Sequence, residues 1–461
     1  MAVTIHNSGR SRLATLAVLA WPAIIEQILA TMVSYVDTGM VGSLGANATA
    51  AVGINAPVLW LLNGIFQGVG VGFSVLVAHA IGARDLEKAR KTIIQSLLAA
   101  LTVGLGIFLV AMGLSGLIPK WLGAETDVLP GAVAYLRVYA LSLPFGAMLY
   151  ILSAIIRCMG NTRLPLLLNT GANVLNVVMN FLLIYPTRQI RGVTVWGAGW
   201  GVAGAAAATT LSIAAAGGIM LLTLFLRKDE FRLSPKEDYH PDREIISRAA
   251  RLGLPYIAER CAINLGQIAT TYIIGQIGTV AMAANHIAVT AEGLCYLPAY
   301  GISYAATTLV GQSVGAGDKD GARKYGTLSG LCGFALCALT GLALFLFAPQ
   351  LASLFSGDDV AVLDEAVKVL RTVAPAEPFF ATFIVLAGAL RGAGDTKFPM
   401  ILCLISMWGV RVVVAPILVF VFQVGLVGVW AAMAMDLVVR GVGCALRWRS
   451  GRWVKLAHLK E

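Results

Sequence analysis

The sequence predicts an all-α membrane protein with about twelve transmembrane helices, arranged as two six-helix lobes. The first observation is composition: the 461 residues are 58% hydrophobic and 13% charged, whereas soluble domains carry about 25% charged residues. The second is a series of apolar runs, each close to the ~20 residues that a helix needs to cross a bilayer. The third is a repeat of the first half of the chain in the second half. Together these observations exclude a soluble globular protein.

The predicted helices follow the apolar runs in order. They begin near residues 14, 50, 93, 131, 164, 197, 248, 281, 326, 364, 398 and 424. No short hydrophobic segment with an Ala-x-Ala site opens the chain, so we expect no cleaved signal peptide. The helices divide into an N-lobe at 1–226, a charged, proline-containing linker at 227–247, and a C-lobe at 248–461 with a short basic cytoplasmic tail.

The repeat is visible when the chain is shifted on itself by 233 or 234 residues. Matching pairs include Pro22 with Pro255, Glu26 with Glu259, Gly82 with Gly315, Arg157 with Arg391, and Pro165 with Pro399. Six helices per half preserve the orientation of the second copy, because an even number of spans returns the chain to its starting side. The halves are therefore predicted to be parallel repeats about an axis along the membrane normal.

The basic residues indicate the topology. The net charge is +10, but Lys and Arg lie between the apolar runs and form no basic domain, so no nucleic-acid partner is expected. Most of them fall on one side of the predicted membrane, which the positive-inside rule makes the cytoplasm, with both termini there. Within the predicted spans we place only Arg260 and Arg411.

The chain has no pattern typical of an enzyme or a cofactor protein. The seven cysteines are scattered through apolar segments without a paired CxxC. There is no nucleophile beside a base, no phosphate-binding loop with Lys, and no dinucleotide fingerprint. We predict no cofactor, no resident metal and no enzymatic activity; an integral membrane enzyme, which would need Asp-rich or His-rich motifs at a membrane face, is the least favoured class.

The segment Trp21 to Gly45 carries the first candidate site, because Glu26 and Asp37 lie in a single apolar run. Eleven residues at ~100° each place both carboxyl groups on one helix face. Acids at membrane depth are expensive and mark ion or proton sites. Pro22 removes a backbone donor near the start of the run and is predicted to act as a hinge. The alternative is that both acids only pack against polar neighbours.

Amides follow one face of the fifth predicted span. Asn169, Asn173, Asn176 and Asn180 are spaced four, three and four residues apart. The sixth span adds Thr209 after a run of small residues that allows close helix approach. Carbonyl and hydroxyl oxygens suit a small cation or a proton site. The alternative is that the amides only hold helices together, an interpretation that applies most to Asn169.

The second half carries a different set of charged residues within its predicted spans. They are Glu259, Glu292, Glu377, Arg411 and Asp436. A buried arginine needs a counter-charge, so Arg411, Glu292 and Asp436 are predicted to form a structural charge cluster. Glu259 repeats Glu26, but the counterpart of Asp37 is Thr270, so the two halves are expected to differ in chemistry.

The motifs of both halves resemble those of the multidrug and toxic compound extrusion (MATE) family, in its bacterial NorM-like branch. They are VDTGMVGSLG (36–45), VAHAIGARD (77–85), RCMGNTRLP (157–165), NVLNVVMNFLLI (173–184), LVGQSVGAGD (309–318) and LRGAGDTKFP (390–399). The resemblance implies a multi-pass protein of the bacterial cytoplasmic membrane with a central cavity that opens alternately to either side. It implies export of amphiphilic or cationic drug-like compounds in exchange for H⁺ or Na⁺. We expect a monomer in the lipid bilayer.

The resemblance also implies which residues bind the coupling ion. Asp37, Asn176, Asn180 and Thr209 match the family's N-lobe cation site, although relatives often have Asp in place of Asn180. Glu259 matches a glutamate of the sodium-coupled branch, whose second acid aligns with Phe380, so Glu377 is the remaining candidate there. Glu26, Glu259 and Glu377 are therefore secondary candidates. One carboxylate among neutral ligands favours H⁺ over Na⁺.

A second function from the same superfamily is transport of a lipid-linked precursor. Such a flippase is expected to line its cavity with several Arg or Lys for a pyrophosphate, and only two arginines lie in the predicted spans. This count favours a drug antiporter.

Overall fold

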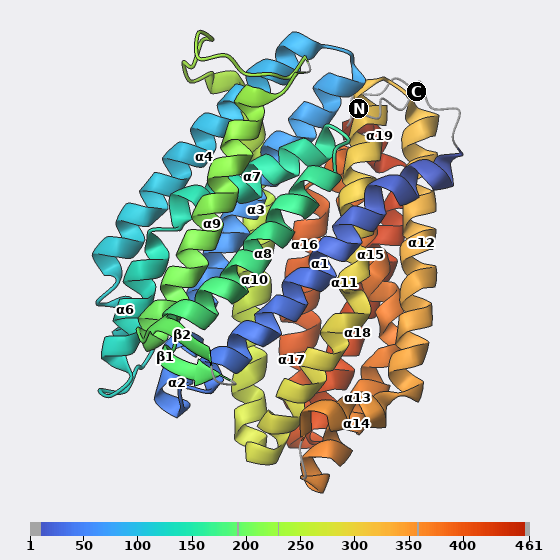
Figure 1. Ribbon diagram of the computed structural model, residues 1–461. Helices are drawn as coiled ribbons and strands as arrows, with labels where there is room; N and C mark the ends of the chain where they lie inside the picture. Colours follow the sequence, from blue (N-terminus) through green and yellow to red (C-terminus); the bar gives the residue numbers. More distant parts are fainter. Residues whose placement is uncertain (1–10, 191–192, 229, 357–358, 457–461) are drawn as a thin grey trace.

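The computed structural model describes residues 11–190, 193–228, 230–356 and 359–456; the expected cytoplasmic ends at 1–10 and 457–461 lie outside them. The described chain is a bundle of long helices (Figure 1). The first half contains α1 (Arg12–Gly42), α2 (Ala46–Gly53), α3 (Ala56–Gly82), α4 (Leu86–Leu114), α5 (Ile118–Trp121), α6 (Leu129–Ala140), α7 (Leu143–Cys158), α8 (Arg163–Leu183) and α9 (Gly201–Leu226).

The second half repeats this order of long helices. It contains α10 (Arg243–Ile277), α11 (Thr279–Gly315), α12 (Lys319–Leu346), α13 (Ala348–Ser356), α14 (Val360–Val373), η1 (Ala374–Ala376), α15 (Glu377–Gly392), α16 (Lys397–Ser406), η2 (Met407–Arg411), α17 (Val412–Pro416), η3 (Ile417–Val421), α18 (Leu426–Arg449) and α19 (Arg452–Leu456). The turns η2 and η3 are π-helical. The lobe boundaries at 226 and 248 stay predictions.

The described part of the chain forms twelve long helical rods, so the prediction of about twelve spans in two six-helix lobes is confirmed. In the described residues, nine rods are apolar enough to span a membrane, and α6 with α7, bent by 53°, makes a tenth. The two others are α10 and α11, which are the longest helices at 35 and 37 residues. They fall short in hydropathy because they carry the polar residues that line the interior.

A short β-hairpin between α8 and α9 was not predicted. Its strands β1 (Pro186–Ile190) and β2 (Val193–Ala198) pair antiparallel, with Arg188 opposite Val195. The run of β-branched residues and a tryptophan in VTVW favours an extended conformation over a helix. The connection between two apolar spans is therefore an ordered element at one end of the bundle.

The first long helix of each half also packs against the other half. Leu16, Leu19 and Ala20 of α1 belong to a buried cluster formed with helices of the second half, and α1 lies along α11 (Figure 1). In the reverse direction, α10 packs on α3, where a Cβ placed on Gly72 would lie 2.3 Å from the Ala249 carbonyl oxygen. Each lobe is thus completed by a helix that begins the other half of the chain.

The outer surface is apolar, as a lipid-facing surface requires. Exposed large hydrophobic side chains occur along the outer helices of both halves. Examples are Leu105, Leu109, Leu222, Leu339, Leu342 and Phe420. A patch of this extent on a soluble protein would cause association, so these helices are in contact with lipid.

The lobes meet closely at the ends of α3 and α11. A Cβ on Gly82 would lie 1.9 Å from the Gln312 carbonyl oxygen, and one on Gly315 would lie 2.0 Å from that of His79. Two hydrogen bonds join the lobes at the same level, from Gln312 Nε2 to the Cys158 carbonyl oxygen (2.7 Å) and between His79 Nε2 and the Gly392 carbonyl oxygen (2.7 Å). The bundle is closed at the end where α1 begins.

We expect Gly82→Val to prevent this closure, because no rotamer removes a branched side chain from backbone atoms this close. Overpacking of a tight interface destabilises it by about 1–3 kcal/mol, so the melting temperature of the detergent-purified protein should fall by several degrees. Gly106→Val is the control, since nothing lies within 4 Å of a Cβ there. Equal melting temperatures of the two variants would contradict a tight lobe contact.

Candidate functional site

A central cavity of about 740 Å³ lies between the lobes. Helices α1, α3, α7 and α8 of the first half and α10, α11, α15, η2 and α18 of the second half line it. Aromatic side chains form much of its wall, and Tyr296 lies edge-on to Phe380 with ring centroids 5.0 Å apart. A volume of this size holds one drug-sized molecule.

The structure brings the four primary candidates together outside this cavity. Asn180 Nδ2 donates hydrogen bonds to Asp37 Oδ1 and to Asn176 Oδ1 (3.2 Å), and Asn176 Nδ2 donates to Thr209 Oγ1 (3.1 Å). Asn180 is 1% exposed and Asn176 is also buried. Helices α1, α8 and α9 therefore meet through one continuous polar chain, in which Asp37 is the single ionisable group.

The other two amides of the fifth predicted span belong to a different environment. Asn169 and Asn173 line the central cavity, and Asn169 Nδ2 donates to Glu26 Oε1 (2.7 Å). Glu26 also forms a buried ion pair with Arg157 at the end of α7. The amide stripe therefore divides into two parts, one facing the cavity and one facing Asp37.

The second half repeats the pair of Glu26 and Arg157. Arg391 Nη2 donates to both carboxylate oxygens of Glu259, at 2.7 and 2.9 Å, and the Glu259 side chain is 3% exposed. The repeat thus places the same Glu–Arg pair on both sides of the cavity. The two secondary candidates Glu26 and Glu259 each form an ion pair with an arginine.

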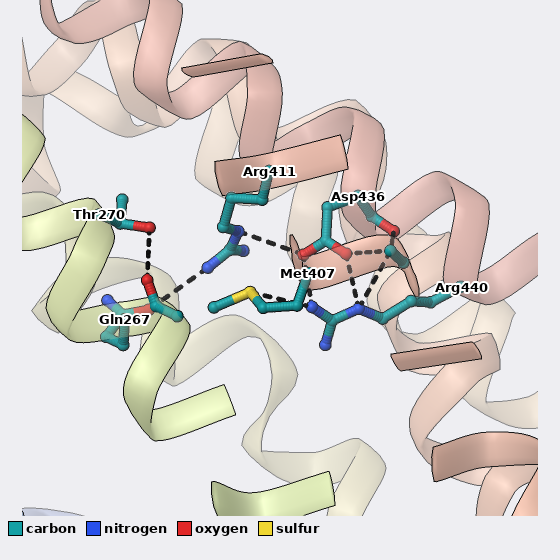
Figure 2. A network of polar contacts seen from close by, with 8 residues as sticks. Gln267, Thr270, Met407, Arg411, Asp436 and Arg440 are labelled. Carbon is teal, nitrogen blue, oxygen red and sulfur yellow. Dashed lines mark hydrogen bonds and ion pairs between the residues drawn. The ribbon is translucent and has the colours of Figure 1, made fainter. Parts of the chain in front are cut away.

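A third charge cluster joins η2 to α18 (Figure 2). Asp436 is completely buried and forms ion pairs with Arg411 Nε (3.1 Å) and Arg440 Nη2 (2.5 Å). Ser406 donates to the same carboxylate, and Arg411 Nη1 donates to Gln267 Oε1 of α10 (3.3 Å). One carboxylate therefore forms ion pairs with two guanidinium groups.

Glu292, the other acid expected beside Arg411, is placed differently. It lines the cavity, but it forms no ion pair with Arg411 or any other base among the residues described. Its nearest ionisable neighbour on α15 is Glu377, which is fully buried behind the wall. The two carboxyl groups lie together, and Arg411 acts on Glu292 electrostatically without forming an ion pair with it.

The count of arginines in the membrane was wrong. Five arginines line the cavity: Arg157, Arg260, Arg391, Arg411 and Arg440. Only Arg260 and Arg411 were expected within the spans, so Arg157, Arg391 and Arg440 were expected outside them. They lie instead in the last turns of α7 and α15 and in the middle of α18, where each is held by a buried carboxylate. The argument against a lipid-linked precursor as substrate, which rested on that count, therefore fails.

Two helical lobes around a cavity that is closed at one end, with buried acids in its helices, are typical of membrane transporters. The MatE family model matches residues 22–182 and 255–417, once in each lobe. The chain belongs to the MatE family, as the sequence motifs indicated. The two matches begin 233 residues apart, which is the offset of the repeat.

Named relatives support this membership. The chain is 30% identical over 449 residues to a Thermotoga maritima protein named as a probable multidrug resistance protein NorM, covering 96% of this chain and 93% of the relative. A crystal structure of a MATE protein in the straight conformation has a TM-score of 0.88 at 25% identity, with 97% and 98% of the chains covered. These relatives are transport proteins, which is consistent with the expectation that the chain is not an enzyme.

A further solved structure, of a transporter from Pyrococcus furiosus, has a TM-score of 0.89 at 24% identity and covers 98% of this chain and 97% of that one. It is described as a member of the MOP superfamily in which a reversed polarity of the binding pocket suggests a different function. This likeness shows that the two chains share one fold over nearly their whole length.

We expect Glu26→Gln to destabilise the protein, because it leaves Arg157 buried without a counter-charge. Breaking a buried pair from one side costs about 3–5 kcal/mol, so the melting temperature in detergent should fall clearly. The double variant Glu26→Gln with Arg157→Gln should recover much of the loss. Glu244→Gln is the control, since its partner Arg248 is 54% exposed. A loss no larger than that of the control would show that the pair is not structural.

Proposed function

We propose that the protein exports amphiphilic, drug-like compounds across the bacterial cytoplasmic membrane in exchange for protons, by alternating access. Membership of the MatE family and relatives named as multidrug resistance proteins support the substrate class. The drug-sized cavity between the lobes supports alternating access. In this proposal the protein acts as a monomer with both termini in the cytoplasm.

The proposed coupling residue is Asp37, and one observation carries the assignment. Of the two acids in α1, Glu26 has Arg157 as an ion-pair partner, whereas Asp37 is held by the neutral amide of Asn180 and forms no ion pair within the described residues. Protonation of Glu26 would leave Arg157 uncompensated. Protonation of Asp37 would remove a charge that nothing else neutralises.

The same polar chain leads us to propose H⁺ as the ion. Na⁺ prefers several oxygen ligands and more than one carboxylate, and Asp37 is accompanied only by Asn176, Asn180 and Thr209. One observation favours Na⁺ as the second candidate: the buried Oδ1 of Asn180 accepts no hydrogen bond from the described residues. In the C-lobe, Glu259 is engaged by Arg391, which disfavours a Na⁺ site at that residue.

The proposed cycle begins from the form described here. With the termini in the cytoplasm, the end closed by Gly82 and Gly315 faces inward and the cavity faces the outside. Proton release or binding at Asp37 changes the packing of α1 against α8, and Pro22 allows α1 to bend. Since α1 also packs on the second half, its movement is transmitted to the contact between the lobes.

Asp37→Asn is expected to abolish efflux driven by a proton gradient, because Asn retains the volume and removes the titratable group. The measurement is gradient-driven movement of a fluorescent amphiphile in proteoliposomes, with a pH gradient or a Na⁺ gradient imposed separately. Glu125→Gln, in the α5–α6 connection, is the control. Undiminished efflux by Asp37→Asn would rule out its role, and efflux driven only by Na⁺ would make Na⁺ the ion.

The two parts of the amide stripe should also separate in this assay. Asn180→Ala and Asn176→Ala should impair gradient-driven efflux at normal amounts of folded protein, because they disrupt the polar chain at Asp37. Asn169→Ala should affect it less, since its partner is Glu26. If all three variants lose efflux and folded protein in equal measure, the amides serve only to hold helices together.

A further inference from the structure

The charged side chains of the central cavity are predominantly basic. Five arginines and three carboxylates (Glu26, Glu259 and Glu292) line it. Two further acids, Asp436 and Glu377, lie behind the wall and are not part of the lining. We propose that the cavity selects amphiphiles that carry a carboxylate or phosphate group over amphiphilic cations. This inference rests on the proposed function, because it names the substrate class of the same cavity.

The pairing of the arginines shows where the excess charge lies. Arg157 and Arg391 are each matched by their own glutamate. Arg411 and Arg440 share the single carboxylate of Asp436, and Glu292 also acts on Arg411 electrostatically. Arg260 is the lining arginine for which the described residues provide no ion pair. Its charge lies at the cavity wall, in a low-dielectric environment where it acts strongly on an incoming ligand.

Arg260 provides the group that would contact the anion. Its Nε and Nη2 atoms donate to the Tyr256 hydroxyl (2.9 and 2.7 Å), and no described carboxylate forms an ion pair with it. The guanidinium carries five N–H groups, so part of the group is left for a ligand. A guanidinium binds carboxylate or phosphate through two parallel hydrogen bonds.

The neighbours of Arg260 hold it ready for such a ligand. The guanidinium lies over the rings of Tyr256 (5.0 Å to the centroid) and Tyr300 (5.8 Å). The Tyr256 hydroxyl donates in turn to Gln67 Oε1 of α3 (3.0 Å). These contacts fix the orientation of the arginine without neutralising it, so its charge remains available to the cavity.

The rest of the wall suits the apolar part of an amphiphile. Tyr296, Tyr300 and Phe380 form an aromatic cluster beside the arginines, with centroid separations of 6.2 and 5.0 Å. Glu292 forms no ion pair among the described residues, although Arg411 acts on it electrostatically. A cation bound at Glu292 would therefore compete with Arg411.

The test uses two dyes that differ by one anionic group. Rhodamine 110 carries a free carboxylate, and rhodamine 123 is its methyl ester and a cation. Binding to the purified full-length protein is measured by fluorescence polarisation without any ion gradient. We expect the carboxylate dye to bind about tenfold more tightly, as a charge-assisted hydrogen-bonded pair worth about 1.4 kcal/mol gives. Equal or tighter binding of the ester would overturn the inference.

The variants assign the preference to Arg260. Arg260→Gln should remove the roughly tenfold preference by weakening carboxylate-dye binding while leaving the ester unaffected. Arg260→Lys should keep part of it, because the charge remains and the fork geometry is lost. Arg371→Gln, at an exposed arginine of α14 outside the cavity, should change neither dye. An unchanged preference in Arg260→Gln, with the variant folded, would contradict the role of this residue.

Competition with farnesyl phosphate and farnesol distinguishes a lipid phosphate from a drug-like carboxylate. Displacement of rhodamine 110 by the phosphate and not by the alcohol supports anion recognition for both sources. Binding of farnesyl phosphate without binding of rhodamine 110 assigns the site to prenyl phosphates. Binding of neither anion overturns the inference. If the protein prefers the carboxylate dye but neither a proton nor a Na⁺ gradient drives efflux in proteoliposomes, the proposed function is refuted and this inference stands.

Discussion

Charge burial at membrane depth is the constraint on which the interior depends. An ionised side chain in the bilayer is stable only with a partner. The chain provides such a partner through the same Glu–Arg ion pair in each half. Glu26 with Arg157 connects α1 to α7, and Glu259 with Arg391 connects α10 to α15. Helices α1 and α10 are also the ones that pack against the opposite half. Each ion pair therefore fixes a helix that contacts both halves of the chain.

Apart from these shared Glu–Arg pairs, the two lobes differ in their buried polar residues. The first half adds Asp37 with its neutral amide and hydroxyl neighbours, outside the cavity. The second half has Thr270 at the matching position and gathers its additional charge at the cavity, in Arg411, Asp436 and Arg440. The N-lobe therefore offers a carboxylate held only by neutral groups, and the C-lobe offers the charged residues of the cavity. In the proposed function, ion coupling at Asp37 and substrate recognition in the cavity are thus separated in space.

The spans and the repeat could be predicted because they depend on hydropathy and on residue spacing along the chain. The polar chain at Asp37 joins three helices, and its grouping of Asp37 with Asn176, Asn180 and Thr209 was implied by the family resemblance. The five cavity arginines could not all be predicted. Arg157 and Arg391 occupy last turns of helices, where a sequence cannot distinguish a side chain in cytoplasmic water from one directed back into the protein. Their partners lie 131 and 132 residues away. The repeat contained a usable signal, because Glu26, Glu259, Arg157 and Arg391 are all duplicated.

The position of α1 explains how two separate sites can act on one conformational equilibrium. Near its start, Leu16 and Leu19 pack in the C-lobe core, in its middle Glu26 holds Arg157 at the cavity, and near its end Asp37 joins the polar chain to α8. The backbone of Arg157 in turn accepts a hydrogen bond from Thr308 of α11 (3.4 Å). In the proposed function, a change of charge at Asp37 alters the packing of a helix that also borders the cavity and the lobe contact. Coupling therefore requires no direct contact between ion and substrate, only two arrangements of this one helix.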